Sequence, residues 1–519
     1  MSLTAQRPSV RDWLLLGVLA LLAAAIRLSI GPLPVDDAYI SFRYARNLGS
    51  GLGLVYNPGE TVFGTSTPLY TLLLSGASTL LPKVDLAFLA LWLNSIADAL
   101  TTVLLVGIGR RLGMTRGIAT IAGVAFALSP VVIRYSIGGL ELSVVTLLAL
   151  AAFLAYIAGR RALAAHLAGA AFLGRPDALL VGAVVILVAT SLARRPDYQT
   201  GAILSLWVLP MVLTLWISTG LPLPHSAVAK SHPVYMIQPL TNLRQALLFF
   251  SGLFAAGPLG LGAEGFWTNP SPLAALLTTL VLLPQSYLWF EGAKSAGRAE
   301  SRALVLPVYA ALLVLIYATL GLRGSAVAEW YFLPILPISI LLVLRGAESL
   351  RSSAAGSRLP LALGVLLIVC QIAGLNLGRD PRKALLLPLA AWSEREQLYR
   401  EAAAILRPRL APDDRVAASE IGALGFYCEC RVLDTVGLVS PSALHYYPLP
   451  DEAYAGNYAI PPGLIRDQQP EYLVSLEIML RNTLMQDEWF LSNYRQIWYG
   501  ATDAFGSRGL LVFARQDLE

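Results

Sequence analysis

Two adjacent acids, Asp36 and Asp37, follow Pro34 directly after the first strongly apolar segment of this 519-residue chain. Neighbouring positions on a helix point about 100° apart, so the two carboxylates face different surroundings. One of them can cap a helix that begins there, because a carboxylate is favoured at the positive end of the helix dipole. The other is then available as a general base or as a cation ligand. From these two residues alone, capping and catalysis both stay open.

A second candidate is the sequence Gly174-Arg175-Pro176-Asp177, which lies between the two apolar arms of residues 162 to 192. A helix needs about 20 apolar residues to cross a bilayer, so each arm is too short and the apex should lie below the outer surface. A guanidinium at that depth needs a partner. Asp177 offers a local ion pair, which is one interpretation. The other is a phosphate clamp, because the planar guanidinium fork suits clustered anionic oxygens.

More polar residues interrupt the apolar pattern near the ends of other predicted spans. They are Arg43, Glu141, His225, Lys230, Arg323, Glu329 and Tyr331. Each has an ordinary explanation, such as a helix-start acid, a solvated loop or an aromatic belt. The topology inferred from charge bias, however, places all of them on the outer face. We therefore expect one outward-facing polar cavity, open to lipid.

The elements that position these residues are predicted to be membrane helices. Hydrophobic residues make up 56% of the chain and charged residues 14%, and the mean hydropathy is +0.62. These values are typical of an α-helical polytopic membrane protein. The basic residues recur in short clusters between apolar runs, so the net charge of +5 reflects positive-inside loops rather than nucleic-acid binding.

About 11 transmembrane helices are expected, with the N-terminus cytoplasmic and the C-terminus extracytoplasmic in the cell membrane. The apolar runs that predict them are 13 to 30, 86 to 108, 117 to 133, 142 to 158, the pair in 162 to 192, 202 to 219, 271 to 290, 303 to 321, 332 to 345 and 359 to 377. An outer loop, residues 31 to 83, carries a predicted interfacial helix with Ile40, Tyr44 and Leu48 at helical spacing.

The composition changes after Asn376, where charged, proline and aromatic residues become more frequent. A helical stretch from 393 to 406 precedes strand-like runs near 415 to 419, 472 to 476 and 509 to 514. We expect a membrane module of residues 1 to 378 and a small extracytoplasmic α/β domain of residues 379 to 519. Cys428 and Cys430 are separated by one residue, and because such a pair closes only a strained ring, no disulfide framework is predicted.

The first outer loop resembles that of a known enzyme superfamily. The run Asp36-Asp-Ala-Tyr-Ile-Ser-Phe-Arg43-Tyr-Ala-Arg-Asn47, with Gly53-Leu-Val-Tyr-Asn57-Pro-Gly-Glu60 and Thr67-Pro-Leu after it, resembles the polyprenyl-phosphate-dependent GT-C glycosyltransferases. Within them it is most similar to the mycobacterial-type membrane arabinofuranosyltransferases and mannosyltransferase-like relatives. Shorter similarities follow in order at 139–141, 175–177, 223–230, 330–337, 421–425 and 432–434.

The resemblance implies an inverting membrane glycosyltransferase without a required metal or cofactor. It would transfer a sugar, arabinofuranose or mannose-like, from a polyprenyl-phosphate donor to a glycan, lipid or protein acceptor of the cell envelope. Asp37, or failing it Asp36, would be the general base, and a divalent cation held by both acids is left open. The donor would be bound by Arg175, Lys230, His225, Arg43 and Arg323, and the acceptor or sugar by Glu141, Glu329 and Tyr331.

Two other functions are consistent with a polar cavity in a membrane protein. A lipid-linked sugar flippase or transporter would be expected to show related halves or interrupted helices in corresponding positions, and the sequence shows neither. An oligosaccharide ligase that uses a polyprenyl-diphosphate donor would need more positive charge at the cavity. Scanning mono- and diphosphate donors separates these alternatives, since a transporter forms no glycosidic bond.

Overall fold

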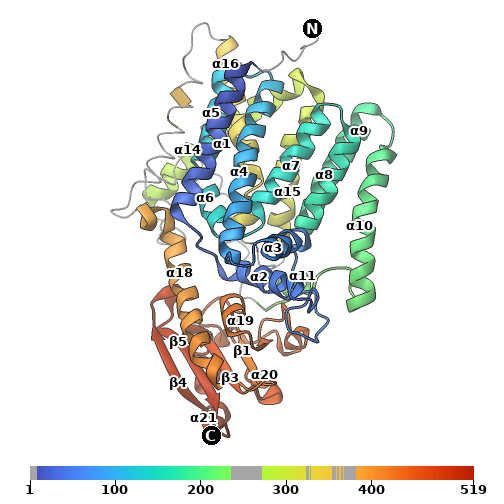
Figure 1. Cartoon of the computed structure of the whole chain (residues 1–519). Helices are drawn as coiled ribbons and strands as arrows, with labels where there is room; N and C mark the ends of the chain where they lie inside the picture. The colour runs from blue at the N-terminus through green and yellow to red at the C-terminus, as the bar shows by residue number, and fades with distance from the viewer. Residues whose placement is uncertain are drawn as a thin grey trace.

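The structure, a computed structural model, describes residues 9–234, 272–322, 327, 329–353, 358, 362–363, 366 and 381–518. Within these residues the chain forms a bundle of helices, drawn in the upper part of Figure 1, and a part built around a β-sheet below it. The first described residues lie at the far end of the bundle from the sheet. Cavity-forming segments lie where the two parts meet.

The bundle consists of apolar helices whose backbone polar groups are satisfied within each helix, as a bilayer requires. The helices are α1 (Val10–Ile30), α4 (Leu86–Arg111), α5 (Arg116–Ala127), α6 (Pro130–Ile137), α7 (Leu142–Ile157), α8 (Arg161–Gly174), α9 (Leu179–Ala193), α10 (Tyr198–Thr219), α14 (Pro272–Ala299), α15 (Val305–Leu322) and α16 (Ile335–Ser353). They coincide with the predicted apolar runs up to residue 353.

Five helices of the described part are long and apolar enough to cross a membrane, or six if the bent pair α5 and α6 is one span. Large apolar side chains on the outer helices are exposed, as lipid-facing residues are: Leu21 of α1 is 71% exposed and Ile217 of α10 is 82% exposed. The chain is therefore a multi-pass membrane protein. The number of eleven spans stays a prediction, and most of the run 359 to 377 lies outside the described residues.

The predicted hairpin is formed by α8 and α9, which have 14 and 15 residues. Its second arm is not too short to cross a membrane, contrary to the prediction, because the 3-10 turn extends it to the 18 residues of Pro176–Ala193, which are apolar enough for a span. Pro176 ends α8, because a proline disfavours the helical conformation in the residue before it. Arg175 accordingly has the extended backbone angles φ −160° and ψ 135°, and a 3-10 turn over Pro176–Ala178 leads into α9. The turn points Arg175 and Asp177 into the same space.

Three short helices lie at the end of the bundle that faces the sheet: α2 (Asp36–Gly49), α3 (Pro68–Leu80) and α11 (His225–Ser231). The helix predicted to begin at the two acids is α2. It does not lie at an open membrane surface, however, because ten of its 14 residues are buried. The C-terminal part of the chain covers the face of α2 that points away from the bundle.

The C-terminal part contains a mixed sheet flanked by helices. Its elements are α18 (Pro381–Leu406), β1 (Arg415–Ala418), α19 (Gly422–Cys428), β2 (Arg431–Asp434), α20 (Pro462–Gln468), β3 (Tyr472–Leu476), α21 (Glu488–Asn493), β4 (Tyr494–Ala501) and β5 (Gly509–Arg515). The strand order is β2-β1-β3-β5-β4, with β2, β1 and β3 parallel and β5 antiparallel to both of its neighbours. The unit β1-α19-β2 is a parallel crossover with a short helix.

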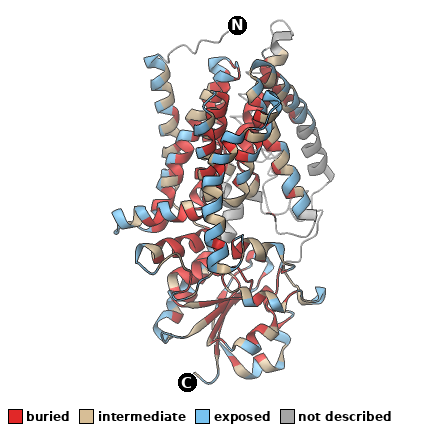
Figure 2. Cartoon of the chain, turned by 90° about the vertical axis from the view of Figure 1, so that its right-hand side faces the viewer, coloured by how far each residue is buried: buried red, intermediate tan, exposed pale blue. Residues whose placement is uncertain are grey.

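The core continues from the bundle into the C-terminal part without a break. One cluster of buried residues joins side chains of α2, such as Phe42, to side chains of α19 and β1, such as Leu424 and Val416. Figure 2 shows this as buried residues on both sides of the junction. Cys428 and Cys430 form a disulfide, contrary to the expectation from their spacing, because Glu429 between them adopts a left-handed conformation (φ 59°) that turns the chain.

Candidate functional site

A partly open cavity of about 190 Å³ lies where the bundle meets the C-terminal part. Segments far apart in the sequence contribute to it, namely α2, the loop before α3, the start of α7, the α8–α9 turn, α11, α15 and the loop after β2. Its polar lining residues are Asp37, Ser41, Thr65, Ser66, Thr67, Glu141, Arg175, Asp177, Ser226, Lys230, Tyr317, Trp330 and Tyr331. Ile40, Leu140 and Leu438 supply apolar surface.

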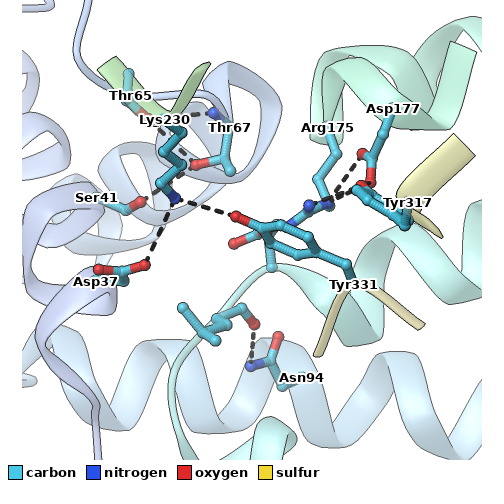
Figure 3. Close-up of polar contacts among 12 residues, drawn as sticks. Asp37, Ser41, Thr65, Thr67, Asn94, Arg175, Asp177, Lys230, Tyr317 and Tyr331 are labelled. Carbon is cyan, nitrogen blue, oxygen red and sulfur yellow. Dashed lines mark hydrogen bonds and ion pairs between the residues drawn. The ribbon is translucent and has the colours of Figure 1, made fainter. Parts of the chain in front are cut away.

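Asp37 and Lys230 face each other in this cavity. Lys230 Nζ lies 3.9 Å from Asp37 Oδ2 and donates a hydrogen bond of 3.2 Å to the Tyr331 hydroxyl, as Figure 3 shows. The two charged side chains are 33% and 41% exposed, so both are accessible from the cavity. Burial lowers the pKa of Lys230, but Tyr331 and Asp37 raise it by more, and the net shift is upward. Lys230 is therefore a stable cation.

Arg175 is held on two sides by carboxylates. It donates from Nη1 to Glu141 Oε1 at 2.6 Å and from Nε to Asp177 Oδ1 at 3.0 Å. The Tyr317 hydroxyl donates to the same Asp177 carboxylate, and the guanidinium lies over the Tyr331 ring at 4.7 Å from its centroid. The local Arg–Asp pair expected as one interpretation is thus present, with Glu141 as a second partner. This arrangement fixes the Arg175 side chain in place.

The loop that carries Glu141 is tied to the neighbouring elements. Asn94 of α4 donates hydrogen bonds of 2.9 Å to the Leu140 carbonyl of this loop and to the Ser136 carbonyl at the end of α6, and Tyr70 of α3 donates to the Gly139 carbonyl at 3.0 Å. The backbone N–H of Val35, next to the start of α2, donates to the loop at 3.1 Å. Glu141 and the first turn of α2 are therefore held at a fixed relative position.

Hydroxyl groups form one wall of the cavity, which the sequence reasoning missed. Thr67 Oγ1 lies 3.2 Å from both Ser41 Oγ and Thr65 Oγ1. The signal that could have found this wall is the run Thr65-Ser66-Thr67 directly after Gly64 in the outer loop. Such groups donate and accept hydrogen bonds and suit a sugar. Tyr317 and Leu438 were also missed, because each lies in an otherwise ordinary apolar segment.

The structure places three of the predicted site residues away from the cavity lining. Asp36 is 3% exposed, and its two oxygens accept hydrogen bonds from the backbone N–H groups of Gly422 and Ala423 at 2.9 and 2.8 Å. Arg43 is 2% exposed and also contacts the C-terminal part. His225 accepts from the Phe63 backbone N–H at 3.3 Å, and burial lowers its pKa.

The remaining predictions concern residues that are described only in part and a metal ion. Arg323 lies outside the described residues, and so does the side chain of Glu329. Within the described ranges, no group of three or more His, Cys, Asp or Glu side chains is placed to hold a metal ion. A divalent ion shared by Asp36 and Asp37 stays a prediction.

Residues 389–514 match the model of a domain of unknown function (DUF8728). No curated protein matches the chain. Among solved structures, ArnT from Cupriavidus metallidurans in the apo state is similar, with a TM-score of 0.57 and 12% identity over 97% of this chain and 98% of that chain. The same protein bound to undecaprenyl phosphate gives a TM-score of 0.54 and 12% identity over 98% and 99% of the two chains.

The archaeal oligosaccharyltransferase AglB from Archaeoglobus fulgidus, in complex with an inhibitory peptide and a dolichol-phosphate, is also similar. Its TM-score is 0.56 with 12% identity over 98% of this chain and 75% of that chain. At this identity the likeness concerns the fold, and the narrower similarity to arabinofuranosyltransferases stays a prediction. The chain has the fold of the GT-C glycosyltransferases.

Proposed function

We propose that this protein transfers a sugar from a polyprenyl-phosphate donor to a hydroxyl of a cell-envelope acceptor, with Asp37 as the general base. The observation that carries the proposal is the placement of Asp37 opposite Lys230 in a cavity at the end of the membrane bundle. The reaction needs a carboxylate that takes the proton of the attacking hydroxyl and a cation that binds the donor phosphate. The undecaprenyl phosphate and dolichol-phosphate in the complexes of ArnT and AglB support this class of donor.

Lys230 is the proposed partner of the donor phosphate. Its contact with Asp37 is long, at 3.9 Å, so a phosphate can replace that carboxylate as the closest anion. The exchange would leave the Asp37 carboxylate free to accept the proton of the acceptor hydroxyl. Donor binding would in this way prepare the base for its task.

In the reaction, the acceptor oxygen forms a bond to the anomeric carbon while the bond from that carbon to the phosphate oxygen breaks. The electron pair of the broken bond goes to the phosphate, and the proton of the acceptor hydroxyl goes to Asp37. Attack from the face opposite the phosphate inverts the anomeric carbon. Because a phosphate leaves without being protonated, no second carboxylic acid is required, unlike in glycoside hydrolysis.

The charge balance of the cavity favours a monophosphate donor over a diphosphate donor. The described lining residues include two cations, Lys230 and Arg175, and three carboxylates, Asp37, Glu141 and Asp177. Arg175 is already bonded to two of these carboxylates. A diphosphate would bring an additional negative charge without a further described cation to receive it.

The sugar is proposed to lie between the hydroxyl wall and Glu141. The hydroxyl-bearing residues Ser41, Thr65 and Thr67 and the acid Glu141 all line the cavity. Tyr331 contacts both cations beside this space, because its hydroxyl accepts a hydrogen bond from Lys230 and its ring lies under Arg175. An arabinofuranose or a mannose-like sugar, and an extracytoplasmic active face, belong to this proposal. Arg43 and His225 are left out of it because neither lines the cavity.

The proposal is tested with the variant Asp37→Asn in purified, reconstituted protein. We expect transfer from polyprenyl-phosphate sugars to fall by roughly 10²-fold to 10⁴-fold, the usual range for loss of a general base. Binding of the polyprenyl-phosphate donor should be retained, since the change removes no cation. The control is Asp85→Asn, because Asp85 is an exposed acid that caps α4 outside the cavity.

Three outcomes would contradict the proposed function. Full transfer activity in folded Asp37→Asn protein would exclude Asp37 as the base. Movement of the lipid-linked sugar across a vesicle membrane, without formation of any glycosidic bond, would instead indicate a flippase. Transfer from diphosphate donors only would indicate an oligosaccharide ligase.

A further inference from the structure

Several side chains of the first outer loop contact the C-terminal part rather than the cavity. Its side chains in this contact, which we call the docking residues, are Asp36, Arg43, Tyr56, Asn57 and Glu60. Their hydrogen-bond and ion-pair partners in the C-terminal part lie between Ile421 and Val432, in α19, in the residues next to its two ends and at the start of β2. In Figure 1, α2 lies directly against α19 at the junction.

Asp36 bonds to the first turn of α19. Its carboxylate accepts the backbone N–H groups of Gly422 and Ala423 at 2.9 and 2.8 Å and is buried. The N–H groups in the first turn of a helix have no partners within the helix, so Asp36 supplies partners that α19 lacks. A carboxylate is also the favoured charge at that end of a helix. Asp36 thus caps a helix of the C-terminal part rather than its own helix.

Arg43 bonds to the opposite end of α19. Its guanidinium donates to the Gly425 carbonyl at 2.7 Å and to the Cys430 carbonyl at 2.6 Å. It also donates from Nε to the Tyr56 carbonyl at 2.8 Å and lies over the Tyr56 ring. A cation near the C-terminal end of a helix matches the helix dipole. Asp36 in the first turn of α2 and Arg43 about two turns later therefore contact the two ends of α19.

Asn57 extends the contact to the sheet. Its side-chain amide donates to the Val432 carbonyl at 2.9 Å and its carbonyl accepts the Val432 N–H at 3.1 Å. Glu60 forms an ion pair of 2.8 Å with Arg431 in the same strand. The outer loop therefore pairs with the outer edge of β2, the end strand of the sheet order.

The close approach of α2 and α19 requires glycine at two positions. A Cβ atom at Gly422 would overlap the backbone carbonyl of Asp36, and one at Gly425 would overlap the Tyr56 hydroxyl. Neither glycine has a positive φ angle. They are required for close contact rather than for an unusual backbone conformation. This feature gives a way to disturb the contact without changing any charge.

We propose that Asp36 is a positioning residue through which the C-terminal part holds α2 so that Asp37 faces the cavity. Neighbouring helix positions differ by about 100°, so bonding Asp36 to α19 fixes the direction of Asp37. The C-terminal part also contributes Leu438 to the cavity lining, so it completes the site as well as orienting it. The inference rests on the proposed function of Asp37 and assigns to the C-terminal part a role in the chemical step.

Three variants disturb the contact in different ways. Asp36→Asn keeps the shape and one acceptor oxygen but removes the charge. Gly422→Ala introduces the overlap with the Asp36 backbone. Tyr56→Phe is the mildest, because it removes only the hydrogen bond from the Tyr56 hydroxyl to the Ile421 carbonyl, which is 2.6 Å long. It keeps the contact testable if a stronger variant does not fold.

Matched controls come from the same chain. Asp85→Asn removes the charge of a helix-capping acid that bonds only to its own helix. Gly456→Ala adds a Cβ in the C-terminal part where the nearest atoms, those of Ile478, are at the ordinary contact distance of 3.4 Å. Neither control residue lines the cavity.

The first measurement is amide hydrogen exchange of the α2 segment in the full-length protein in detergent or nanodiscs, which requires no substrate. We expect faster exchange over residues 36–49 in the Asp36 and Gly422 variants and unchanged exchange in the two controls. Unchanged exchange in all three docking variants would overturn the inference, because the C-terminal part would then not hold α2.

The second measurement is steady-state transfer from a polyprenyl-phosphate sugar. We expect kcat to fall roughly tenfold to hundredfold, the effect of a small misplacement of a catalytic group, while the donor KM stays within about twofold. The pH profile of kcat/KM should keep the shape of the wild-type profile, because Asp37 is still the base. If the fall in kcat/KM at acidic pH, which reports protonation of the general base, disappeared in Asp36→Asn, Asp36 would be the base and the inference would be overturned.

Failure of the proposed function gives a different result. In that case the wild-type protein itself would form no glycosidic bond with any polyprenyl-phosphate donor. If the wild-type protein is active, and the docking variants show faster exchange in α2 but a wild-type kcat, Asp36 is a structural contact only and the positioning role is wrong.

Discussion

At the scale of single residues, the two cations of the cavity differ in how firmly they are bound. Arg175 is 12% exposed and bonded to Glu141 and Asp177, whereas Lys230 is 33% exposed and has Asp37 at 3.9 Å. A cation with a weak, exposed partner can exchange it for a ligand at low cost, and a buried one bonded to two carboxylates cannot. Lys230 is therefore the residue whose removal should weaken donor binding most directly.

Replacing Lys230 by Met keeps most of the length of the side chain and removes its charge. We expect the affinity for a polyprenyl-phosphate to fall roughly tenfold to hundredfold, the usual range for a hydrogen bond to a charged group. Binding of the labelled lipid to purified protein measures this. Lys294→Met is the control, since Lys294 lies on α14 in an exposed pair with Glu291. Equal affinities for the Lys230 variant and wild-type protein would assign the phosphate to another group.

At the scale of elements, the site depends on where helices end. Pro176 ends α8 and directs Arg175 into the cavity, and the α6–α7 connection turns at Gly139 so that Glu141 faces it. Gly139 has a φ angle of 76°, and a Cβ there would lie 3.0 Å from Phe42 and 3.2 Å from Ala38. This loop therefore packs directly against α2, so a change in it should alter the position of the proposed base.

The variant Gly139→Ala should lower both stability and transfer activity. Its left-handed backbone alone costs an alanine about 1–2 kcal/mol. Gly51→Ala is a matched control, because Gly51 has a φ angle of 78° with no atom within 4 Å of its added Cβ. Thermal unfolding should show a loss in both variants, with the larger loss and a fall in kcat at Gly139 only. Equal behaviour of the two variants would mean that packing of this loop against α2 has no effect on the site.

At the scale of the whole molecule, buried charge collects where α18, α2 and the end of β1 meet. Arg395 forms ion pairs with Glu396 at 2.7 Å and with Glu420 at 3.2 Å, and Asp36 is close enough to interact with it. Burial raises the pKa of Glu420 to about 8; Arg395 opposes this shift, and Asp36 adds to it. Three carboxylates therefore share one guanidinium at the junction that holds the two parts of the molecule together.

The raised pKa of Glu420 makes the folded junction pH-dependent. The folded protein binds this proton more tightly than an unfolded chain, whose ordinary value is 4.5. The corresponding stabilisation is complete below that value and is lost as the pH rises through about 8. The charged and titratable groups that act on Glu420 are Arg395, Glu396, Asp36 and Asp37, and its carboxylate also accepts from Tyr458.

We therefore expect the unfolding temperature to fall between pH 5 and pH 9 in wild-type protein and to fall less in Glu420→Gln. Above pH 8 the variant should be at least as stable as the wild type, because it carries no buried charge at this position. Burial raises the pKa of Asp434 to about 6, so the unfolding temperature also falls as the pH rises through that lower value. This second fall remains in Glu420→Gln. Identical pH curves for the two proteins would show that Glu420 does not titrate at the junction.

The sequence by itself determined the features that local patterns encode. Apolar runs located the bundle helices, the polar break at residues 174–177 located the turn between α8 and α9, and two acids after a proline located the start of α2. These features depend on residues that are close together in the chain, so spacing and residue type are sufficient to predict them. The same reasoning placed Asp37, Glu141, Arg175, Lys230 and Tyr331 on one side of the membrane, and the structure brings them to one cavity.

Only the tertiary structure decided which of the two acids faces that cavity. Asp36 and Gly422 are 386 residues apart, and no local pattern encodes a contact over that distance. For the same reason the sequence did not predict the contact of Arg43 with α19, and Thr65, Thr67 and Leu438 line the cavity without a strong sequence signal. Periodicity determines the face of a helix on which a residue lies, and the packing of distant segments determines what that face contacts.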